Sequence, residues 1–189
     1  SLFHTTFNIA NLLILIWFTK LIAQLVSKLI PMKETSEDAF TLKHIKIGLL
    51  STPDASLFQA KEEITLYGKN TQEMFHKVTE CLDLSPKDFE RPFENLIRME
   101  DESDTVEIEI ADYLTKVSES KLSTENSQRV SAMFKIVSEI ESIADSSLNI
   151  AKAINRRNEQ NVVFPEGLTN KLKHMFTLIE DTLSVMCTN

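Results

Sequence analysis

Glycine and proline are scarce in this chain, whose 189 residues include only 3 glycines and 5 prolines. Both residues interrupt regular helices, whereas the leucine, lysine and glutamate that are abundant here favour them. A fold built from many short strands and tight turns needs more of both breakers. The composition therefore predicts an all-α protein with long helices.

Cysteine is almost absent, and the familiar motifs of catalysis are missing. Cys81 and Cys187 are the only cysteines, and their spacing fits neither a CxxC motif nor a zinc site. The sequence has no glycine-rich phosphate-binding loop, no GxSxG and no HExxH. We therefore expect a reduced, cytosolic environment for the thiols and no enzymatic activity.

Positive charge is in deficit, with 20 lysines and arginines against 28 aspartates and glutamates and a net charge of −8. Binding to phosphate backbones needs clustered lysine and arginine side chains, so a nucleic-acid partner is excluded. The excess of acids instead suits a solvated surface or carboxylates that bind a cation.

The first part of the chain is apolar. From Phe7 to Ile30 most residues are apolar, and about 20 such residues span a bilayer. Lys20 interrupts this run, but a lysine can extend its amino group to the membrane interface. Lys28 and Lys33 lie at or after its end, which places the downstream side in the cytoplasm. Residues 1–30 are therefore predicted to form a transmembrane helix.

Two other interpretations of this run remain open. An amphipathic helix lying on the membrane surface would show a similar composition. A signal peptide is disfavoured because its charges should precede the apolar stretch, whereas here they follow it. Because the chain starts at Ser1 rather than Met, we expect a piece of a longer protein.

The remainder divides into a linker, residues 31–53, and a helical bundle, residues 54–189. Apolar residues recur at steps of three and four in four segments, at 57–82, 93–117, 130–151 and 168–186. Ser85-Pro86 marks one helix start, and Ser123 or Thr124 caps another. Short connections between long amphipathic helices predict an antiparallel bundle.

Carboxylates interrupt two of these apolar stripes. Glu100 and Asp104 are four residues apart and share one helix face, as do Glu141 and Asp145 in the following segment. Both pairs are similarly distant from the turn predicted near residues 120–124, so an antiparallel hairpin places them at one height. Four clustered carboxylates repel one another unless a cation with oxygen ligands neutralises them. The pattern predicts a site for divalent or ferric metal ions.

Two competing interpretations bear on this site. The bundle could be rotated so that the four acids face water, as acidic helix surfaces commonly do. Glu73-x-x-His76 matches half of a carboxylate-bridged di-iron motif, but that site needs a second copy, which the sequence lacks. We therefore interpret the Glu73/His76 spacing as coincidental.

The sequence resembles a known family at these motifs. Residues 139–145, Glu-Ile-Glu-Ser-Ile-Ala-Asp, followed by Leu-Asn-Ile-Ala at 148–151, look like the signature helix of the PhoU family of phosphate-uptake regulators. Residues 100–104, Glu-Asp-Glu-Ser-Asp, resemble its preceding acidic motif. The resemblance implies a three-helix bundle whose paired acidic motifs bind metal clusters. Ser142 and Ser146 stand where the family has arginine and histidine.

A second resemblance lies at the start of the chain. His4-Thr5-Thr6-Phe7-Asn8 with the apolar run is similar to the last membrane helix of bacterial sodium/phosphate cotransporters, and Thr52-Pro53 is similar to their linker. These proteins carry a PhoU-like domain after a membrane core. The resemblance implies a C-terminal part of such a transporter in the cell inner membrane, with a regulatory domain in the cytoplasm. The expected partners are the membrane, the transporter core upstream, phosphate and sodium through that core, and a second copy of the chain.

Two alternative functions stay open. A membrane-tethered helical signalling or scaffold module with no transport role would share the same organisation. A carboxylate-bridged metal enzyme is disfavoured because the histidine ligands are missing.

Overall fold

The computed structural model describes Phe7, Leu42, Lys43, Ile45 and residues 52–188. Apart from Phe7, the predicted transmembrane helix, residues 1–30, lies outside the described residues, as does most of the predicted linker. Within the described part of the chain, no helix combines the length and apolar character needed to cross a membrane. All the described helices belong to one compact unit, Phe40–Asn189.

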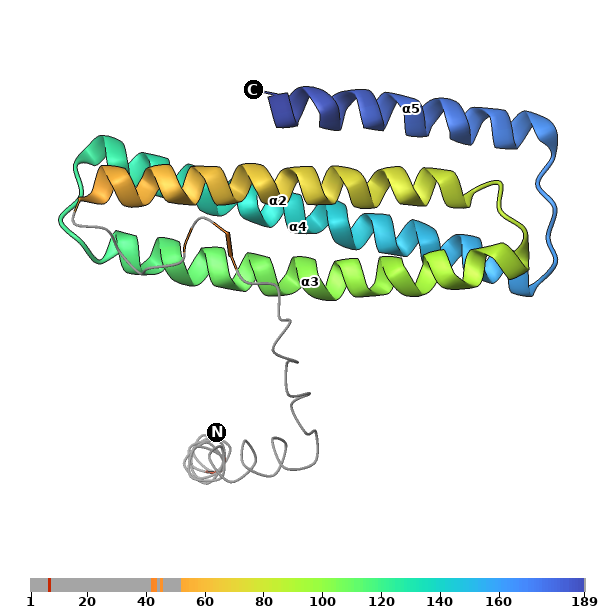
Figure 1. The fold of residues 1–189 in the computed structure, drawn as a ribbon, viewed down its shortest axis with the longest axis horizontal. Coiled ribbons are helices and arrows are strands. Elements are labelled where there is room, and N and C mark those ends of the chain that lie inside the picture. Colours follow the sequence, from red (N-terminus) through yellow and green to blue (C-terminus); the bar gives the residue numbers. More distant parts are fainter. Residues whose placement is uncertain (1–6, 8–41, 44, 46–51, 189) are drawn as a thin grey trace. The chain divides into compact units, whose positions relative to one another are not determined.

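Four helices form this unit, in the order α2 (Pro53–Cys81), α3 (Pro86–Ser118), α4 (Thr124–Glu159) and α5 (Glu166–Thr188). They run alternately up and down (Figure 1). The all-helical prediction is therefore confirmed for the described residues, and each predicted apolar segment lies within one helix or at its end.

Local side-chain and backbone hydrogen bonds define the helix ends. Ser85 caps α3, and Ser123 caps α4 by accepting a hydrogen bond from the Asn126 backbone N–H at 3.1 Å. After α4, Asn161 adopts a left-handed backbone conformation with φ of 52°. The Val162 N–H then donates to the Arg157 carbonyl at 3.0 Å, as in a Schellman motif. These caps end the helices where the chain has to reverse.

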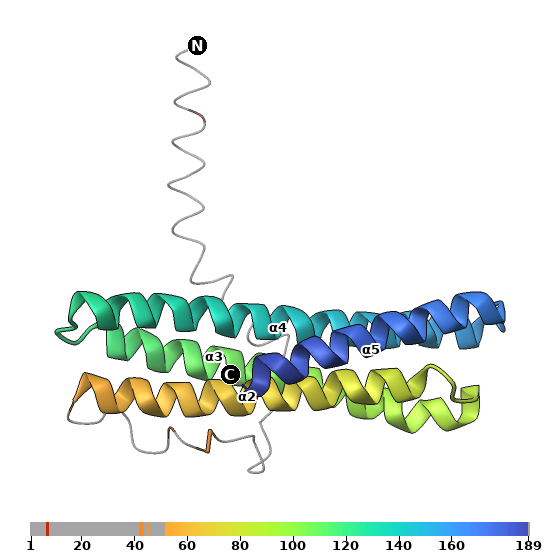
Figure 2. The same ribbon diagram turned by 90° about the horizontal axis from the view of Figure 1, so that it is seen from above.

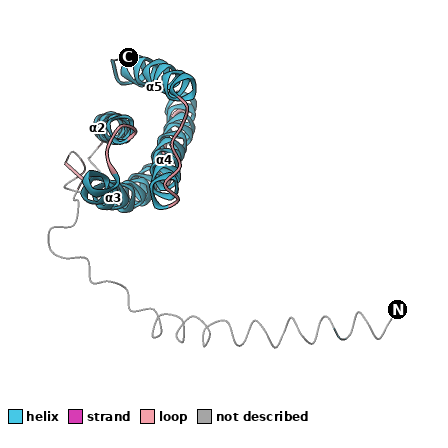
Figure 3. Cartoon of the chain, turned by 90° about the vertical axis from the view of Figure 1, so that its right-hand side faces the viewer, coloured by secondary structure: helices cyan, strands magenta, loops and turns pink. Residues whose placement is uncertain are grey.

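Helices α2, α3 and α4 pack against one another as a three-helix bundle, seen end-on in Figure 3. Their apolar stripes meet in two buried clusters along the bundle axis. One cluster includes Tyr67, Ile110 and Val137, and the other includes Met74, Leu96 and Leu148. Continuous burial along three long helices gives the rigid frame that positions the acidic side chains of α3 and α4.

Helix α5 takes a different neighbour from the one its connection suggests. It packs against α2 rather than α4, and Figure 2 shows it crossing obliquely from the end of α4 towards α2. Phe176 meets Phe75 edge-on with ring centroids 5.8 Å apart. Lys173 forms an ion pair with Asp83 at 2.6 Å. The stretch of six residues between Glu159 and Glu166 lets α5 reach α2, where its aromatic side chain finds an apolar partner.

A buried carboxylate ties the segment before α2 to the bundle. Glu63 is only 1% exposed, and its Oε1 accepts a hydrogen bond from the backbone N–H of Lys43 at 3.2 Å. A buried carboxylate is costly without hydrogen-bond donors. The Glu63–Lys43 bond therefore couples the preceding chain to the bundle core.

Replacing Glu63 with alanine is expected to lower the free energy of unfolding by about 1–3 kcal/mol, because the Lys43 N–H loses its acceptor and the side-chain volume is lost. Glu63→Gln keeps an acceptor and should cost less. Urea unfolding monitored by circular dichroism measures both. The neighbouring, more exposed Glu62→Ala serves as control, with a change within about 0.5 kcal/mol. Equal stability of the alanine and glutamine variants would contradict this role.

Candidate functional site

The four carboxylates predicted as a site lie on two adjacent antiparallel helices. Glu100 and Asp104 are on α3, and Glu141 and Asp145 are on α4. The connection between these helices is short, so residues equally distant from it lie opposite each other. The charge of Asp145 acts on Glu100 across the helix contact and contributes to a raised Glu100 pKa. The structure thus brings the two pairs to the same side of the α3–α4 contact.

These carboxylates differ in their exposure to water. Glu100 and Glu141 are half-buried, whereas Asp104 and Asp145 are exposed. Burial is the main cause of the raised pKa of Glu100, and the negative charge of Asp104 adds to it, while Lys152 acts in the opposite direction. The site is therefore a partly desolvated acidic surface, which we call the acidic face.

Glu107 also belongs to the acidic face, although the predicted site did not include it. Burial raises the pKa of Glu107, and the charges of Glu141 and then Asp104 raise it further. The sequence carried a signal for this residue, since Glu107 continues the steps of four and three that contain Glu100 and Asp104. The predicted site was limited to two carboxylate pairs of equal spacing, and so it did not include Glu107.

A buried hydrogen bond connects the acidic face to α2. The Tyr67 hydroxyl and the Ser103 hydroxyl are 2.9 Å apart, and both side chains are buried. Burial raises the pKa of Tyr67 well above its ordinary value; the Ser103 hydrogen bond opposes this shift, and the nearby charges of Glu107 and Glu141 reinforce it. The phenol therefore stays neutral and links α2 to α3 just beneath the carboxylates.

The arrangement of these side chains does not match a preformed metal site. Over the described residues, no three histidine, cysteine, aspartate or glutamate side chains converge closely enough to hold a metal ion. Asp145 instead accepts a hydrogen bond from Asn149 at 3.3 Å, and Glu141 accepts one from the neighbouring Ser142 hydroxyl at 3.4 Å. Metal binding at Glu100, Asp104, Glu141 and Asp145 stays a prediction, and it requires these side chains to change rotamer.

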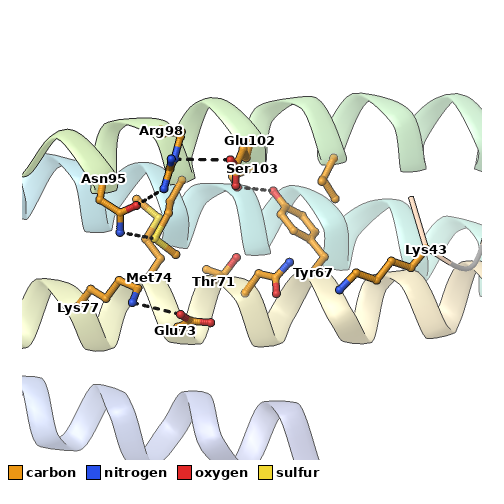
Figure 4. Close-up of a pocket in the computed structure, with 13 residues that line it drawn as sticks. Lys43, Tyr67, Thr71, Glu73, Met74, Lys77, Asn95, Arg98, Glu102 and Ser103 are labelled. Carbon is orange, nitrogen blue, oxygen red and sulfur yellow. Dashed lines mark hydrogen bonds and ion pairs between the residues drawn. The ribbon is translucent and has the colours of Figure 1, made fainter. Parts of the chain in front are cut away.

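A pocket of about 390 Å³ lies between α2 and α3 (Figure 4). Three cationic side chains line it, from Lys43, Lys77 and Arg98. Lys77 pairs with Glu73 at 3.2 Å, and Arg98 approaches Glu102 at 3.8 Å, each within one turn of its own helix. The helical pattern could not predict this pocket, because polar residues on a helix surface normally indicate only exposure to water.

The Glu73/His76 motif does not form a metal site in the described structure. His76 lies against α5, where its Nδ1 is 2.8 Å from a carboxylate oxygen of Glu180. This hydrogen bond raises the pKa of His76. Glu73 pairs with Lys77 instead. His76 therefore helps to attach α5 to α2.

The raised pKa values on the acidic face predict a specific dependence of stability on pH. Glu100 and Glu107 bind protons more tightly in the folded than in the unfolded chain, so acidification from pH 7 through their folded pKa values should stabilise the fold. Glu107→Gln should raise stability at pH 7 by about 0.2–0.5 kcal/mol for each like-charged neighbour relieved, and should gain less on acidification. Urea unfolding at pH 7 and pH 5 measures both effects.

The exposed Glu139→Gln provides a matched control for charge removal on α4. It should leave the pH dependence of unfolding close to that of the parent chain. Identical pH profiles for Glu107→Gln and the parent would contradict the assignment of Glu107 to the acidic face.

The metal hypothesis makes a separate prediction. A cation bound to the folded state alone raises Tm, by an amount that corresponds to roughly 2.7 kcal/mol at a hundredfold excess over Kd. Asp104→Asn or Asp145→Asn should abolish this rise and leave the helix content unchanged, because asparagine keeps the shape but lacks the charge. Melts recorded with chelator, with divalent metal and with ferric ion decide the question. A Tm that none of these changes would refute metal binding.

A comparison with protein-family models finds a match in the central part of the chain. Residues 64–154 match the model of the PhoU domain. This region covers most of α2, all of α3 and α4 as far as Ile154, and includes all five carboxylates of the acidic face. Neither a curated protein nor a solved structure matches the chain. The three-helix bundle, its acidic face and the family match together show that the chain carries a PhoU-like helical domain.

Proposed function

We propose that this chain is the C-terminal part of a sodium-dependent phosphate transporter, with a cytoplasmic PhoU-like domain that regulates transport. The PhoU domain at residues 64–154 indicates a phosphate-related regulatory helical domain. It follows an apolar run at residues 7–30. The order of apolar run and PhoU domain is the observation that carries the proposal.

In this proposal residues 1–30 form the last membrane helix of the transporter and anchor the domain to the inner membrane. The domain itself carries out no chemical reaction. It acts by changing its contacts with a transporter core encoded upstream of Ser1, through which sodium and phosphate pass. The similarity of His4-Thr5-Thr6-Phe7-Asn8 to the corresponding helix of sodium/phosphate cotransporters supports this arrangement.

The acidic face is the surface that best suits such regulation. Cytoplasmic loops of membrane proteins are enriched in lysine and arginine. The half-buried Glu100 and Glu107, with the exposed Asp104 and Asp145, present several like charges at one place. A positively charged loop, or a cation, would relieve their mutual repulsion. We propose that the domain engages the core through this face.

The experiment is an uptake assay on the complete gene, including the sequence upstream of Ser1. Vesicles containing the full-length protein should accumulate labelled phosphate only with a sodium gradient. Deleting residues 54–189 should change the rate of sodium-dependent uptake, and the double variant Glu107→Gln/Glu141→Gln should shift it in the same direction. Glu139→Gln, an exposed site on the helix of Glu141, serves as the control for charge removal.

The outcomes separate the proposed functions. A full-length protein without sodium-dependent uptake would refute the transporter assignment and favour the membrane-tethered scaffold. Uptake that is unaffected by deletion of residues 54–189 would refute the regulatory role. A deletion effect that the double variant does not reproduce would refute the assignment of the acidic face as the contact surface.

A further inference from the structure

The lining of the pocket between α2 and α3 is more positive than the chain as a whole. Three cationic side chains, from Lys43, Lys77 and Arg98, line it against two carboxylates, from Glu73 and Glu102. The complete chain, in contrast, carries a net charge of −8. The volume of about 390 Å³ lies within the range of small-molecule sites. The pocket therefore combines the size of a ligand site with a local excess of positive charge.

Lys77 and Arg98 have N–H donors that their present partners do not use. An ammonium group has three donors, and a guanidinium group has five. In the described part of the chain, Lys77 has one ion-pair partner, Glu73, at 3.2 Å. Arg98 extends from α3 towards α2 (Figure 4). It donates to Asn95 at 2.6 Å, and its Nε is 3.8 Å from Glu102, which is too long for a hydrogen bond. Both cations can therefore bind an anion without losing these partners.

Thr71 contributes a hydroxyl group that has no acceptor of its own. The residue is only 2% exposed and lines the same pocket, and Figure 4 shows its oxygen directed from α2 towards α3. Thr65, Thr105 and Thr115 each donate their hydroxyl to the carbonyl four residues earlier. Within the described residues, the Thr71 hydroxyl makes no hydrogen bond. A largely buried hydroxyl without an acceptor costs stability, so an oxygen of a ligand is favoured beside it.

The paired hydroxyls of Tyr67 and Ser103 offer one further donor. Their oxygens are 2.9 Å apart, both side chains are buried, and both residues line the pocket. Two hydroxyls carry two hydrogens, and the bond between them uses only one. Among the described residues, neither hydroxyl makes a second hydrogen bond. The remaining hydrogen can therefore be donated to an acceptor in the pocket.

We propose that this pocket binds a small tetrahedral oxyanion. Lys77 and Arg98 neutralise its charge, and its oxygens accept hydrogen bonds from Thr71 and from the Tyr67–Ser103 pair. These donors come from two facing helices, α2 and α3. A tetrahedral group presents oxygens to both helices, whereas a planar carboxylate presents its oxygens in one plane. The pocket admits either a free ion or the oxyanion group of a small phosphorylated molecule. The inference goes beyond the proposed function and does not depend on it.

Titration calorimetry of the full chain at constant ionic strength tests the site. The tetrahedral probes are inorganic phosphate, sulfate and glycerol phosphate, and malonate is the planar dianion. We expect saturable binding of the tetrahedral probes that is tighter than the binding of malonate. Tighter binding of glycerol phosphate than of inorganic phosphate would identify a phosphorylated molecule as the source of the group, and the reverse would identify the free ion. No saturable binding of any tetrahedral probe would overturn the site, and malonate binding as tight as that of sulfate would overturn the tetrahedral preference.

Removal of the two cations should weaken the binding of sulfate. Lys77→Gln/Arg98→Gln is expected to raise Kd by at least about tenfold, because two charge-assisted hydrogen bonds are lost. Lys116→Gln/Lys135→Gln removes the same charge from exposed positions on α3 and α4 that do not line the pocket, and should leave Kd within about twofold. Equal weakening by both double variants would overturn the assignment of the pocket.

Removal of the Thr71 hydroxyl separates ligand binding from folding. Thr71→Val should raise the Kd for sulfate by about threefold or more, yet it should not lower the Tm of the ligand-free chain, because no internal hydrogen bond is lost. Thr115→Val is the matched control: it loses the bond to the Ala111 carbonyl and should leave Kd unchanged. A Kd unchanged by Thr71→Val would overturn the role of this hydroxyl. Because these measurements involve no transport, a failed uptake experiment and a failed binding experiment remain distinguishable.

Discussion

Helix α2 contacts each of the other three described helices, and its burial is the constraint on which the rest of the structure depends. On the faces of α2 that these neighbours cover, polar groups cannot reach water, so each buried one needs a partner inside the protein. Tyr67 finds Ser103, and Glu63 finds the backbone N–H of Lys43. These bonds fix how α3 and the segment before α2 sit against α2.

The position of the acidic face follows from this packing. Because α3 and α4 turn their apolar stripes towards α2, carboxylates that interrupt those stripes lie at the margin of the core. Glu100 and Glu107 are therefore partly desolvated and close to further negative charge, which raises their pKa values. Such a surface favours the binding of a proton, a cation or a positively charged partner. Each of these changes the net charge of the domain.

Helix α5 packs on the outside of the bundle formed by α2, α3 and α4. The three mutually packed helices cover one another, whereas α5 contacts only α2 among the described helices. Its buried aromatic contact and its ion pair with Asp83 attach it firmly to α2. Its outward surface carries exposed apolar side chains, among them Met175 and Leu178. The three-helix bundle therefore carries the acidic face, and α5 is an additional helix that packs on α2.

The sequence alone determined the helical class, the four helical segments and the cap at Ser85, because these depend on periodicity and on hydrogen bonds between near neighbours; it left the second cap open between Ser123 and Thr124, and the structure places it at Ser123. It also determined that Glu100/Asp104 and Glu141/Asp145 lie on adjacent antiparallel helices, since a short connection leaves little choice. Only the tertiary structure decided that Glu107 joins them, that Glu63 is buried and that α5 packs on α2. Those outcomes depend on how the helices rotate about their axes and on which apolar faces meet. Both depend on how much apolar surface the whole bundle buries. The local spacing of residues in the sequence does not determine that.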